Sequence, residues 1–574
     1  MKLRIKGLAG VCRVVVAAGI AVSLMGVAAR AEAATLTVAT FSDSTANDGV
    51  CSLREAVRAA NLSPINGDCG TGSSSGNTIV LNAGTAGGAG TYVLSSSTQL
   101  NVSRTLTIQG PNTWTTTIRV DTTGSRGIGV VAPAGNLTLR NVTLTKGSQA
   151  NVVSGLVVTR QQSPQLSLTL DHVRVMNFDS SGIVNDAGNL FVSYSTISNN
   201  SNNGDGGGIA MFSAPDLGIS SRILMDHSAV VGNFSNGNGG GLSRATEGHD
   251  NSRIENSTFT DNDAAQRGGG IFSWGTNSSY LALNHVTIAY NSAGVSGGGF
   301  TEDQAVGSIQ TSKCILNDNM APQGMDIEGT SFVEWSIITN LDELHTDFNI
   351  MNCRVGTAMN ARLGALMFAG GPTQVLPLTP VAPPQPSPAI DFGDPADTAP
   401  VDDQRGYGRP KNGNGGSTAI MDVGAYEYDP APTIFQSENE PMLAKSSDTY
   451  SVVSNASYSG GKGVNLASDA NGDFVIFPVG VLVSGTYNVK VRVKKGSNEG
   501  IFQLSRSPSI NGTQTAIGST QDLYSSSNSW VELNLSSTVP LSAGQTYFKF
   551  AVTGKNASST GRQLFIDYVK LTKL

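Results

Sequence analysis

Short segments in which apolar and polar residues alternate dominate the chain between residues 77 and 369. Alternation with a period of two is the pattern of a β-strand with one buried face. Six of these segments share a central polar pair, and successive copies are 31, 22, 33, 29 and 29 residues apart. The second members of the pairs are Asn141, His172, Tyr194, His227, Asn256 and His285.

A second set of positions repeats in phase with the first. An asparagine series and a series of triple glycines share steps of 33, 29 and 29 residues. The asparagines are Asn200, Asn233, Asn262 and Asn291, and the triplets begin at Gly206, Gly239, Gly268 and Gly297. Two unrelated features with one spacing indicate a coil repeat. Together with the alternating strands, they predict an all-β chain with a right-handed parallel β-helix over 77–369.

Other repeat folds fit this pattern less well. Leucine-rich repeats have a similar length but need a helix or a fixed leucine consensus, and a β-propeller or sandwich has a different repeat length. Within the β-helix, the triple glycines are expected at coil corners where backbones pass closely. The asparagines are expected to occupy left-handed turns. The polar column is expected at a bend, as a structural ladder and not as a metal site.

The repeats carry a resemblance to known proteins. The segment FTDNDAAQRGGGIF (259–272) is similar to the FxxN and GGxI repeats of polymorphic outer-membrane proteins and related exported β-helix proteins. The helix expected in DGVCSLREAVRAAN (48–61) has Ser52 as N-cap and Glu55 three residues later, which is a capping box. The sequence CSLREA (51–56) within it resembles the N-terminal CSLREA segment of exported β-helix proteins. The resemblance implies that residues 34–76 cap the first coil and cover its strand edge.

The N-terminal residues 1–33 have the features of a secretory signal peptide. A basic start precedes an apolar run and the small-residue site Ala31-Glu32-Ala33. No other segment is long and apolar enough to span a bilayer. Removal of residues 1–33 takes away five basic residues and one acidic residue, and changes the net charge from −7 to −11. We therefore expect a secreted or cell-surface protein that has no nucleic-acid partner and no long basic groove.

Four cysteines remain after that cleavage: Cys51, Cys69, Cys314 and Cys353. An even number in an exported protein predicts two disulfides. Of the three possible pairings, the simplest is Cys51–Cys69 with Cys314–Cys353.

Two further regions follow the β-helix. Residues 370–430 resemble the choice-of-anchor segment that closes such helices, and they contain the charged residues Asp391, Asp403, Arg405 and Glu427. These residues form either a site or a salt-bridged cap over the last coil, and the cap is favoured. A short Pro-containing linker then leads into residues 433–574, where alternating segments predict a β-sandwich.

Residues 433–574 contain, in order, Glu438-Asn-Glu440, SYSGGKGV (457–464), Gly485-Thr-Tyr487 and Ile566-Asp567-Tyr568. The order of these motifs resembles that of family-6-type carbohydrate-binding modules. This resemblance implies a structural calcium ion held by Glu438, Glu440 and Asp567, for which carboxylates are suitable ligands. The sugar-stacking aromatics of the family do not map clearly onto this sequence. Tyr458 and Tyr524 are candidates, and Trp530 serves equally well as a core residue.

The residues after each triple glycine vary in chemistry while the framework repeats, so they are the expected lining of a polymer groove. Neighbouring coils stack about 4.8 Å apart, which brings the four copies close together. The candidate substrate-binding residues are Phe212, Glu247, Asp250, Phe272 and Trp274.

The same copies supply candidate catalytic residues. Glu302 and Asp303 would act as the two carboxylates of a glycoside hydrolase. For elimination from a uronic acid, Arg244 would neutralise the substrate carboxylate, and His249 or a tyrosine would take the proton. The alternative is a polar face on a helix without catalysis, because fold alone does not imply function.

We therefore expect a secreted, monomeric protein that binds a polysaccharide and cleaves it as a lyase or a glycoside hydrolase. The alternative is a non-catalytic surface or matrix adhesin, which the repeat type favours, whereas the appended sugar-binding-like sandwich favours the enzyme.

Overall fold

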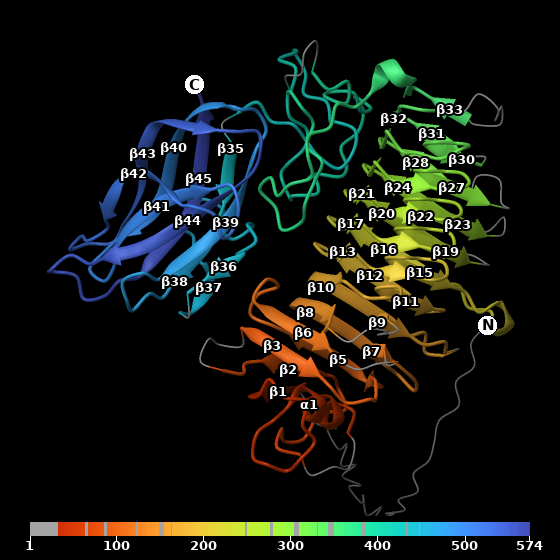
Figure 1. Cartoon of the computed structure of the whole chain (residues 1–574), viewed down its shortest axis with the longest axis horizontal. Coiled ribbons are helices and arrows are strands. Elements are labelled where there is room, and N and C mark those ends of the chain that lie inside the picture. Colours follow the sequence, from red (N-terminus) through yellow and green to blue (C-terminus); the bar gives the residue numbers. More distant parts are fainter. Residues whose placement is uncertain are drawn as a thin grey trace, which may run out of the picture.

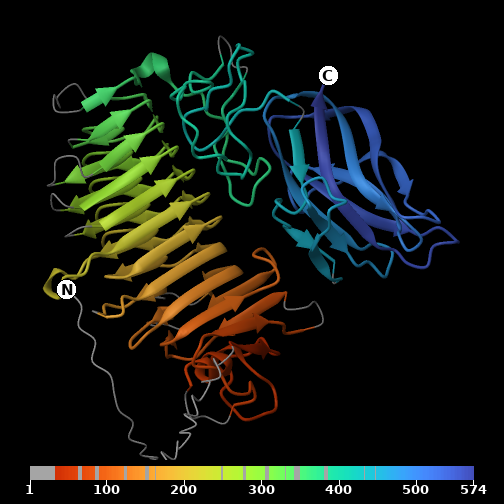
Figure 2. The same ribbon diagram turned by 180° about the vertical axis from the view of Figure 1, so that it is seen from behind.

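A computed structural model describes residues 33–574 except for a few short internal segments. The segments left out are 63–66, 85–88, 122–123, 125, 149–153, 162, 247–249, 276–278, 304–308, 330, 342–348, 381–385, 432 and 447. The expected signal peptide therefore lies almost entirely outside the described residues. The chain forms a parallel β-helix, a closing segment and an antiparallel β-sandwich (Figures 1 and 2).

The β-helix consists of parallel strands stacked coil upon coil into three sheets, as the repeats predict. The largest sheet has two ladders that share the long strands β8 and β10, each of which bends at its centre. Its strands are β1 (Ala34–Val38), β2 (Asn77–Leu81), β3 (Gly90–Leu94), β5 (Thr105–Gln109), β6 (Thr116–Val120), β8 (Asn136–Lys146), β10 (Ser167–Met176), β12 (Asn189–Ser193), β13 (Thr196–Ser198), β16 (Arg222–Asp226), β17 (Ala229–Val231), β20 (Asp250–Glu255), β21 (Thr258–Thr260), β24 (Ser279–Asn284), β25 (Thr287–Ala289), β28 (Ile309–Ser312), β29 (Ile315–Asn317), β31 (Phe332–Glu334), β32 (Ile337–Ile338), β33 (Asn349–Met351) and β34 (Arg354–Val355).

Two smaller sheets complete each coil. A nine-stranded sheet contains β4 (Leu100–Val102), β7 (Arg126–Val130), β9 (Ser154–Val158), β11 (Ile183–Asp186), β15 (Ile209–Phe212), β19 (Leu242–Thr246), β23 (Ile271–Gly275), β27 (Phe300–Asp303) and β30 (Ile327–Glu328). A four-stranded sheet contains β14 (Ser201–Asn202), β18 (Phe234–Ser235), β22 (Asp263–Ala264) and β26 (Ser292–Ala293). Inward-facing apolar side chains from successive coils form one continuous core.

The polar column lies at the bend between the two ladders of the largest sheet, as expected. Its six residues all have positive φ, and the structure continues the column through Lys313, Trp335 and Asn352. Rings also stack along it: His172 lies 4.9 Å from Tyr194, and Tyr194 lies 4.6 Å from His227, between ring centroids. The column is therefore a backbone device supported by stacking between coils.

The asparagine series forms a buried hydrogen-bonded ladder. The side-chain oxygen of Asn262 accepts bonds from the backbone N–H of Asn233 (3.1 Å) and from its side-chain amide (2.9 Å). The same pattern extends from Asn200 to Asn319, and the ladder ends at the carboxylate of Asp326. Burial raises the pKa of Asp326 to about 6.

The expectation that these asparagines adopt left-handed turns is wrong. The residues with positive φ are those immediately before them: Asn199, Gly232, Asp261 and Tyr290. The ladder asparagines instead use their side-chain amides to bind backbone N–H and C=O groups of adjacent coils.

The triple glycines lie at tight corners between coils. Gly268 has a φ of +67°, which favours glycine. A Cβ at the next residue, Gly269, would lie 2.2 Å from the backbone oxygen of Ser292 in the next coil. The corner therefore requires glycine for both conformation and space, as the sequence predicts.

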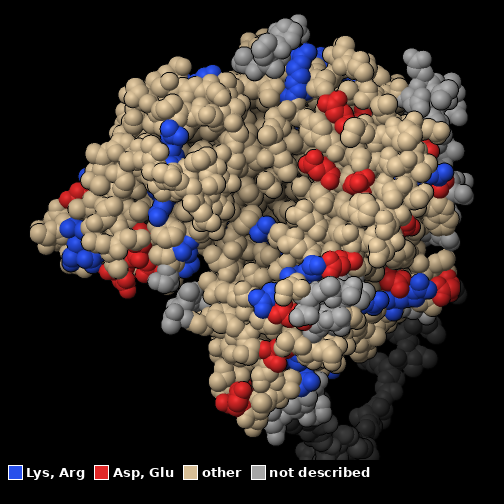
Figure 3. Space-filling model, viewed as in Figure 1, with Lys and Arg blue, Asp and Glu red and all other residues tan. Residues whose placement is uncertain are grey.

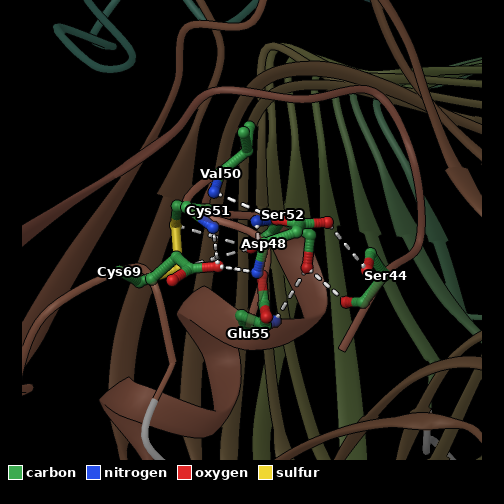
Figure 4. The surroundings of a disulfide bond; sticks show 9 residues. Ser44, Asp48, Val50, Cys51, Ser52, Glu55 and Cys69 are labelled. Atoms are coloured by element: carbon green, nitrogen blue, oxygen red, sulfur yellow. Dashed lines mark hydrogen bonds between the residues drawn. A yellow bond between two sulfur atoms is a disulfide. The ribbon is translucent and has the colours of Figure 1, made fainter. Parts of the chain in front are cut away.

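The N-terminal helix α1 (Leu53–Ala60) begins at the expected capping box, in which Ser52 and Glu55 each bind the other's backbone N–H. The helix packs against β1, β2 and β4 at the end of the stack (Figure 1). Cys51 is joined to Cys69 beside the cap (Figure 4), so the first disulfide prediction is confirmed.

The second predicted disulfide, Cys314–Cys353, is wrong. Strand register places Cys314, Ser336 and Cys353 at one position in three successive coils. Two coil spacings separate the cysteines by about 9.6 Å, beyond the roughly 7 Å limit between Cα atoms. Both thiols are free, and Cys314 is fully buried.

The closing segment runs along the flank of the β-helix beside the bend column. The side-chain oxygen of Gln404 accepts a hydrogen bond from the hydroxyl of Thr258, and the backbone oxygen of Asp402 accepts one from the amide of Asn256. The two residues of each pair are 146 positions apart in the sequence. Arg405 pairs with Asp403 at 2.6 Å in a buried position, so the charged residues have the expected structural role. The described contacts of the segment run along the flank of the stack from His227 to Arg354, whereas a cap over the last coil was expected. A 3-10 turn, η2 (Thr357–Met359), leads into the segment.

The C-terminal sandwich packs two antiparallel sheets around its own core, as predicted. One sheet contains β35 (Thr433–Gln436), β37 (Tyr450–Ser454), β38 (Lys462–Leu466), β40 (Gly485–Lys495), β43 (Ser529–Leu541) and β45 (Leu564–Lys573). The other contains β36 (Ala444–Lys445), β39 (Phe474–Val481), β41 (Ile501–Ser507), β42 (Thr515–Asp522) and β44 (Gly544–Gly554). Hydrogen bonds from Tyr407 to Ile434 and from Phe368 to Gln545 attach it to the closing segment.

The ladder predicts a large effect of one substitution. Asn262→Ala leaves the buried amide groups of Asn233 without their acceptor, so we expect a loss of about 2–4 kcal/mol in the free energy of unfolding. Chemical denaturation measures it. Asn236→Ala removes an exposed asparagine bond and is the matched control, with a change within about 0.5 kcal/mol. Equal effects of the two variants would contradict a stabilising ladder.

The thiols give a second prediction. Non-reducing peptide mapping should recover one disulfide, Cys51–Cys69, and two unlinked cysteines. Burial raises the pKa of the Cys314 thiol to about 12, so a thiol reagent should not label Cys314 in the native protein and should label it in denaturant. A linked Cys314–Cys353 peptide would contradict the register described above.

Candidate functional site

Strand register divides the residues after the triple glycines into an inward column and an outward column. Met211, Arg244, Ser273 and Glu302 are paired across successive coils and point inward. The neighbouring column points outward and contains Asp186, Phe212, Ala245, Trp274 and Asp303. The predicted site residues are therefore split between the two faces of the nine-stranded sheet.

Arg244 and Glu302 lie inside the β-helix. Arg244 is fully buried and donates to the hydroxyls of Ser273 (2.8 Å) and Ser279 (2.9 Å). Glu302 is 6% exposed and accepts a bond from Ser331. A polymer on the outer surface does not reach either side chain, so the structure does not bring the expected catalytic set together.

The outward column forms a strip that we call the aromatic strip, defined as Phe212, Ala245 and Trp274. Phe212 is 37% exposed, and Trp274 is partly exposed two coils away, with the small Ala245 between them. The strip lines a hollow of about 460 Å³ together with Arg160 and Asp186. Arg160 forms ion pairs with Asp186 (3.2 Å) and Asp216 (3.1 Å). The hollow thus combines aromatic faces with charged groups at its edge.

The other groove candidates lie elsewhere. Phe272 is buried, and Asp303 is partly exposed and pairs with Arg267 at 3.3 Å. Glu247 and His249 lie outside the described residues. Asp250 begins β20, and its side chain is also not described.

The acids on the outward column are too far apart for glycoside hydrolysis. Asp186 and Asp303 are four strands apart, about 19 Å at the spacing of parallel strands. The two carboxyl groups of a glycosidase are about 5–9.5 Å apart. Within the described part of this column, no acid pair meets that requirement.

A larger cavity lies where the β-helix, the closing segment and the sandwich meet, and we call it the junction cavity. Its volume is about 900 Å³, and its lining includes Trp114, His172, Arg174, Tyr194, Glu438 and Lys462. Figure 3 shows the surface hollowed between the sandwich and the first coils. This site combines residues that are up to about 350 positions apart in the sequence, and sequence analysis missed it.

The β-helix wall of the junction cavity carries an acid–histidine pair. The Nδ1 atom of His172 lies 2.7 Å from a carboxylate oxygen of Asp171, which also pairs with Arg140 at 3.0 Å. Hydrogen bonding to His172 lowers the pKa of Asp171. Tyr194 stacks on His172, and burial raises the pKa of Tyr194 to about 12. The only sequence signal for this wall is the polar column, whose side chains face the closing segment.

The sandwich wall contains two of the three expected calcium ligands. Glu440 is buried with neither carboxylate oxygen hydrogen-bonded among the described residues, and one oxygen of Glu438 is similarly unpaired. Burial raises the pKa of Glu440 well above its usual value and that of Glu438 to about 7. Two orphaned carboxylates side by side fit a hard cation such as calcium.

The third expected ligand, Asp567, lies near Glu438 but already has other partners. Its carboxylate accepts bonds from the backbone and hydroxyl of Ser459 and pairs with Arg492. A different trio, Asp448, Asp469 and Asp473, has ligand atoms within 4.8 Å of one another, and the described residues show no other group of this size. The Asp473 carboxylate already accepts hydrogen bonds from the hydroxyl of Ser468 and from the backbone N–H of Ala470.

The two candidate sugar-stacking tyrosines of the sandwich differ in exposure. Tyr458 is 5% exposed and packs against Trp530, with ring centroids 4.4 Å apart. It belongs to the interior of this region and offers no open face. Tyr524 follows β42 and is partly exposed, so it retains a surface for contact.

Comparison with known proteins gives matches only among solved structures. No known protein family matches the sequence, and no curated protein matches it. A Paenibacillus xanthan lyase is 34% identical over 27% of this chain and 15% of its own, with a TM-score of 0.22. The CBM36-1 domain of a xylanase from the hindgut metagenome of Trinervitermes trinervoides is 23% identical over 25% of this chain and 98% of its own, with a TM-score of 0.18.

A third structure, a CBM36 carbohydrate-binding module in complex with calcium and xylotriose, is 18% identical over 24% of this chain and 99% of its own, with a TM-score of 0.18. The neighbours are thus carbohydrate-binding modules and carbohydrate-active enzymes, and each is similar to only about a quarter of the protein. Among the described residues, no helix has the length and apolar character to cross a membrane.

The orphaned carboxylates predict a response to calcium. Calcium should raise the melting temperature of the calcium-free protein, because an ion that binds only the folded state at 100 times its Kd stabilises it by about 2.7 kcal/mol. Differential scanning calorimetry measures the shift. In Glu440→Gln most of this shift should disappear, whereas Asp473→Asn should retain it. The reverse result would assign the ion to the Asp448 trio.

Proposed function

We propose that the protein is a secreted polysaccharide-binding protein and that the aromatic strip holds a glycan chain across successive coils. The observation that carries this proposal is the register of Phe212, Ala245 and Trp274, which places two rings about 9.6 Å apart over a hollow of about 460 Å³. The faces of aromatic rings pack on the apolar faces of sugars, and the ion-paired Arg160 and Asp186 offer hydrogen bonds to hydroxyl groups.

Several other features agree with this function. The hollow runs along an extended stack of coils, so a long polymer can contact more than one of them. The expected signal peptide would export the chain. Charged residues make up only 14% of the sequence, and Figure 3 shows no continuous band of basic residues on the face in view. A neutral or weakly charged ligand therefore suits the strip better than a nucleic acid does.

Cleavage of the glycan, by lyase or hydrolase chemistry, is a second candidate function. Its supporting observation is the Asp171–His172 pair at the junction cavity, with Arg174 two residues further along β10. With Nδ1 bonded to Asp171, the other ring nitrogen of His172 can take a proton. Elimination also needs a cation for the substrate carboxylate, which Arg174 would supply. The buried Arg244 and Glu302 do not support cleavage at the strip.

The strip predicts the behaviour of two variants. Trp274→Ala and Phe212→Ala should each weaken binding to a polysaccharide about tenfold or more, which corresponds to about 1.4 kcal/mol. Affinity electrophoresis against a panel of neutral and acidic polysaccharides measures the dissociation constants. Tyr290→Ala removes an equally exposed ring that lies after β25, outside the strip, and this variant should bind normally. A ligand that binds both strip variants as well as the wild type would overturn the proposal for the strip.

The same panel separates an enzyme from an adhesin. Absorbance of an unsaturated product indicates a lyase, and new reducing ends without it indicate a hydrolase. If elimination takes place, His172→Gln should lower the rate at least a hundredfold while binding at the strip persists. A glycan that binds but yields neither product would identify a non-catalytic adhesin.

A further inference from the structure

Arg174 stands apart from the other arginines around the junction cavity. Arg140 pairs with Asp171, and Arg405 pairs with Asp403. The guanidinium of Arg174 instead lies 3.9 Å over the ring of Trp114, and no described carboxylate pairs with it. Burial lowers its pKa to about 10. A partly buried guanidinium without an anionic partner carries a desolvation cost that an anionic ligand would offset.

Trp114 holds this arginine in place. The loop that carries Trp114 is fixed to the β-helix by bonds from Thr113 to His172 and from Thr143 to Thr113. The indole packs in a T-shaped arrangement against Phe368, which lies just before the closing segment, with ring centroids 5.4 Å apart. The ring and the guanidinium are therefore positioned by two parts of the molecule before any ligand arrives, which reduces the entropy cost of binding.

The opposite wall adds a second cation from the sandwich. Lys462 begins β38 and is exposed. It forms no ion pair among the described residues, and its charge acts on the nearby Glu438. The acids that face the cavity are already engaged or belong to the candidate calcium site: Asp171 binds His172 and Arg140, Asp402 binds His227, and Glu438 and Glu440 are the orphaned pair. Arg174 and Lys462 thus remain available to an incoming anion.

The size and lining of the cavity indicate what kind of anion it takes. A volume of about 900 Å³ is at the upper end of the range for pockets that bind small molecules and is far larger than an inorganic ion needs. Besides the two cations, the lining offers the rings of Tyr194 and Tyr450 and the amides of Asn112 and Asn141. Rings, amides and hydroxyl groups around a fixed cation are suited to a sugar that carries an acidic group.

We propose that the junction cavity is a binding site for an acidic oligosaccharide, with the anionic group on Arg174 and Lys462 and the sugar rings between the β-helix and the sandwich. This site is separate from the aromatic strip, and the proposal does not depend on whether a bond is broken there. The overall charge of the chain is negative, so the selectivity would come from these two residues and not from the general field of the protein.

Isothermal titration of the full chain tests the proposal with three probes: an oligogalacturonate, its methyl ester and a sulfated galactan oligosaccharide. The wild type should bind at least one anionic probe ten times more tightly than the methyl ester. Arg174→Gln should weaken that binding at least tenfold, and the exposed Lys462→Gln should weaken it two- to fivefold. Preference between the first and third probes distinguishes a carboxylate from a sulfate ligand.

Arg253→Gln is the matched control, because Arg253 is exposed and pairs with Glu255 outside the cavity. This variant should bind like the wild type. The melting temperature of each variant shows whether it is folded, and Lys462→Gln keeps the test valid if Arg174→Gln is not. Equal binding of the anionic probe and its ester, failure of every probe to bind, or unchanged affinity in both cavity variants would overturn the proposal.

Discussion

The hydrogen-bonded ladder of buried asparagines is the constraint on which the β-helix depends. Each amide oxygen accepts from the preceding coil, and each amide nitrogen donates to the next asparagine and to a backbone oxygen of the preceding coil. Adjacent coils can therefore meet in one register only. A shift of one residue would expose the core face of every strand and leave the amides unpaired. Because the ladder fixes the register, it also aligns Phe212, Ala245 and Trp274 on the outer face.

Much of this architecture can be predicted from the repeats. Strand geometry also explains why some of the predictions for single residues were wrong. Leu242 and Phe300 are core residues, and Arg244 and Glu302 follow them by two positions. The period of two in a strand therefore turns both charged residues inward. The same argument places Cys314 and Cys353 at equivalent positions two coils apart. In each case the chemistry of the residue suggested a role that strand geometry excludes.

The junction cavity could not be predicted in this way. Its walls depend on how the closing segment docks, through contacts such as Gln404–Thr258 that link residues far apart in the sequence. No periodic pattern identifies such partners. The polar column indicated the bend, but stacking of His172 on Tyr194 and the exposure of their edges depend on the neighbouring domains. The candidate calcium ligands Glu438 and Glu440 were predicted from a resemblance, and the third candidate, Asp567, also binds Ser459 and Arg492.

The bonds that join the closing segment to both domains fix how the two proposed glycan sites lie relative to each other. Two modules on a flexible tether sample many separations, and the second binding event then depends on linker length. Here Tyr407 and Phe368 bond directly to the sandwich, while Gln404 bonds to the β-helix. If one glycan occupies both proposed sites, the folded chain sets the distance between them, and this distance would act as a ruler between the acidic sugar in the cavity and the segment that lies on the strip.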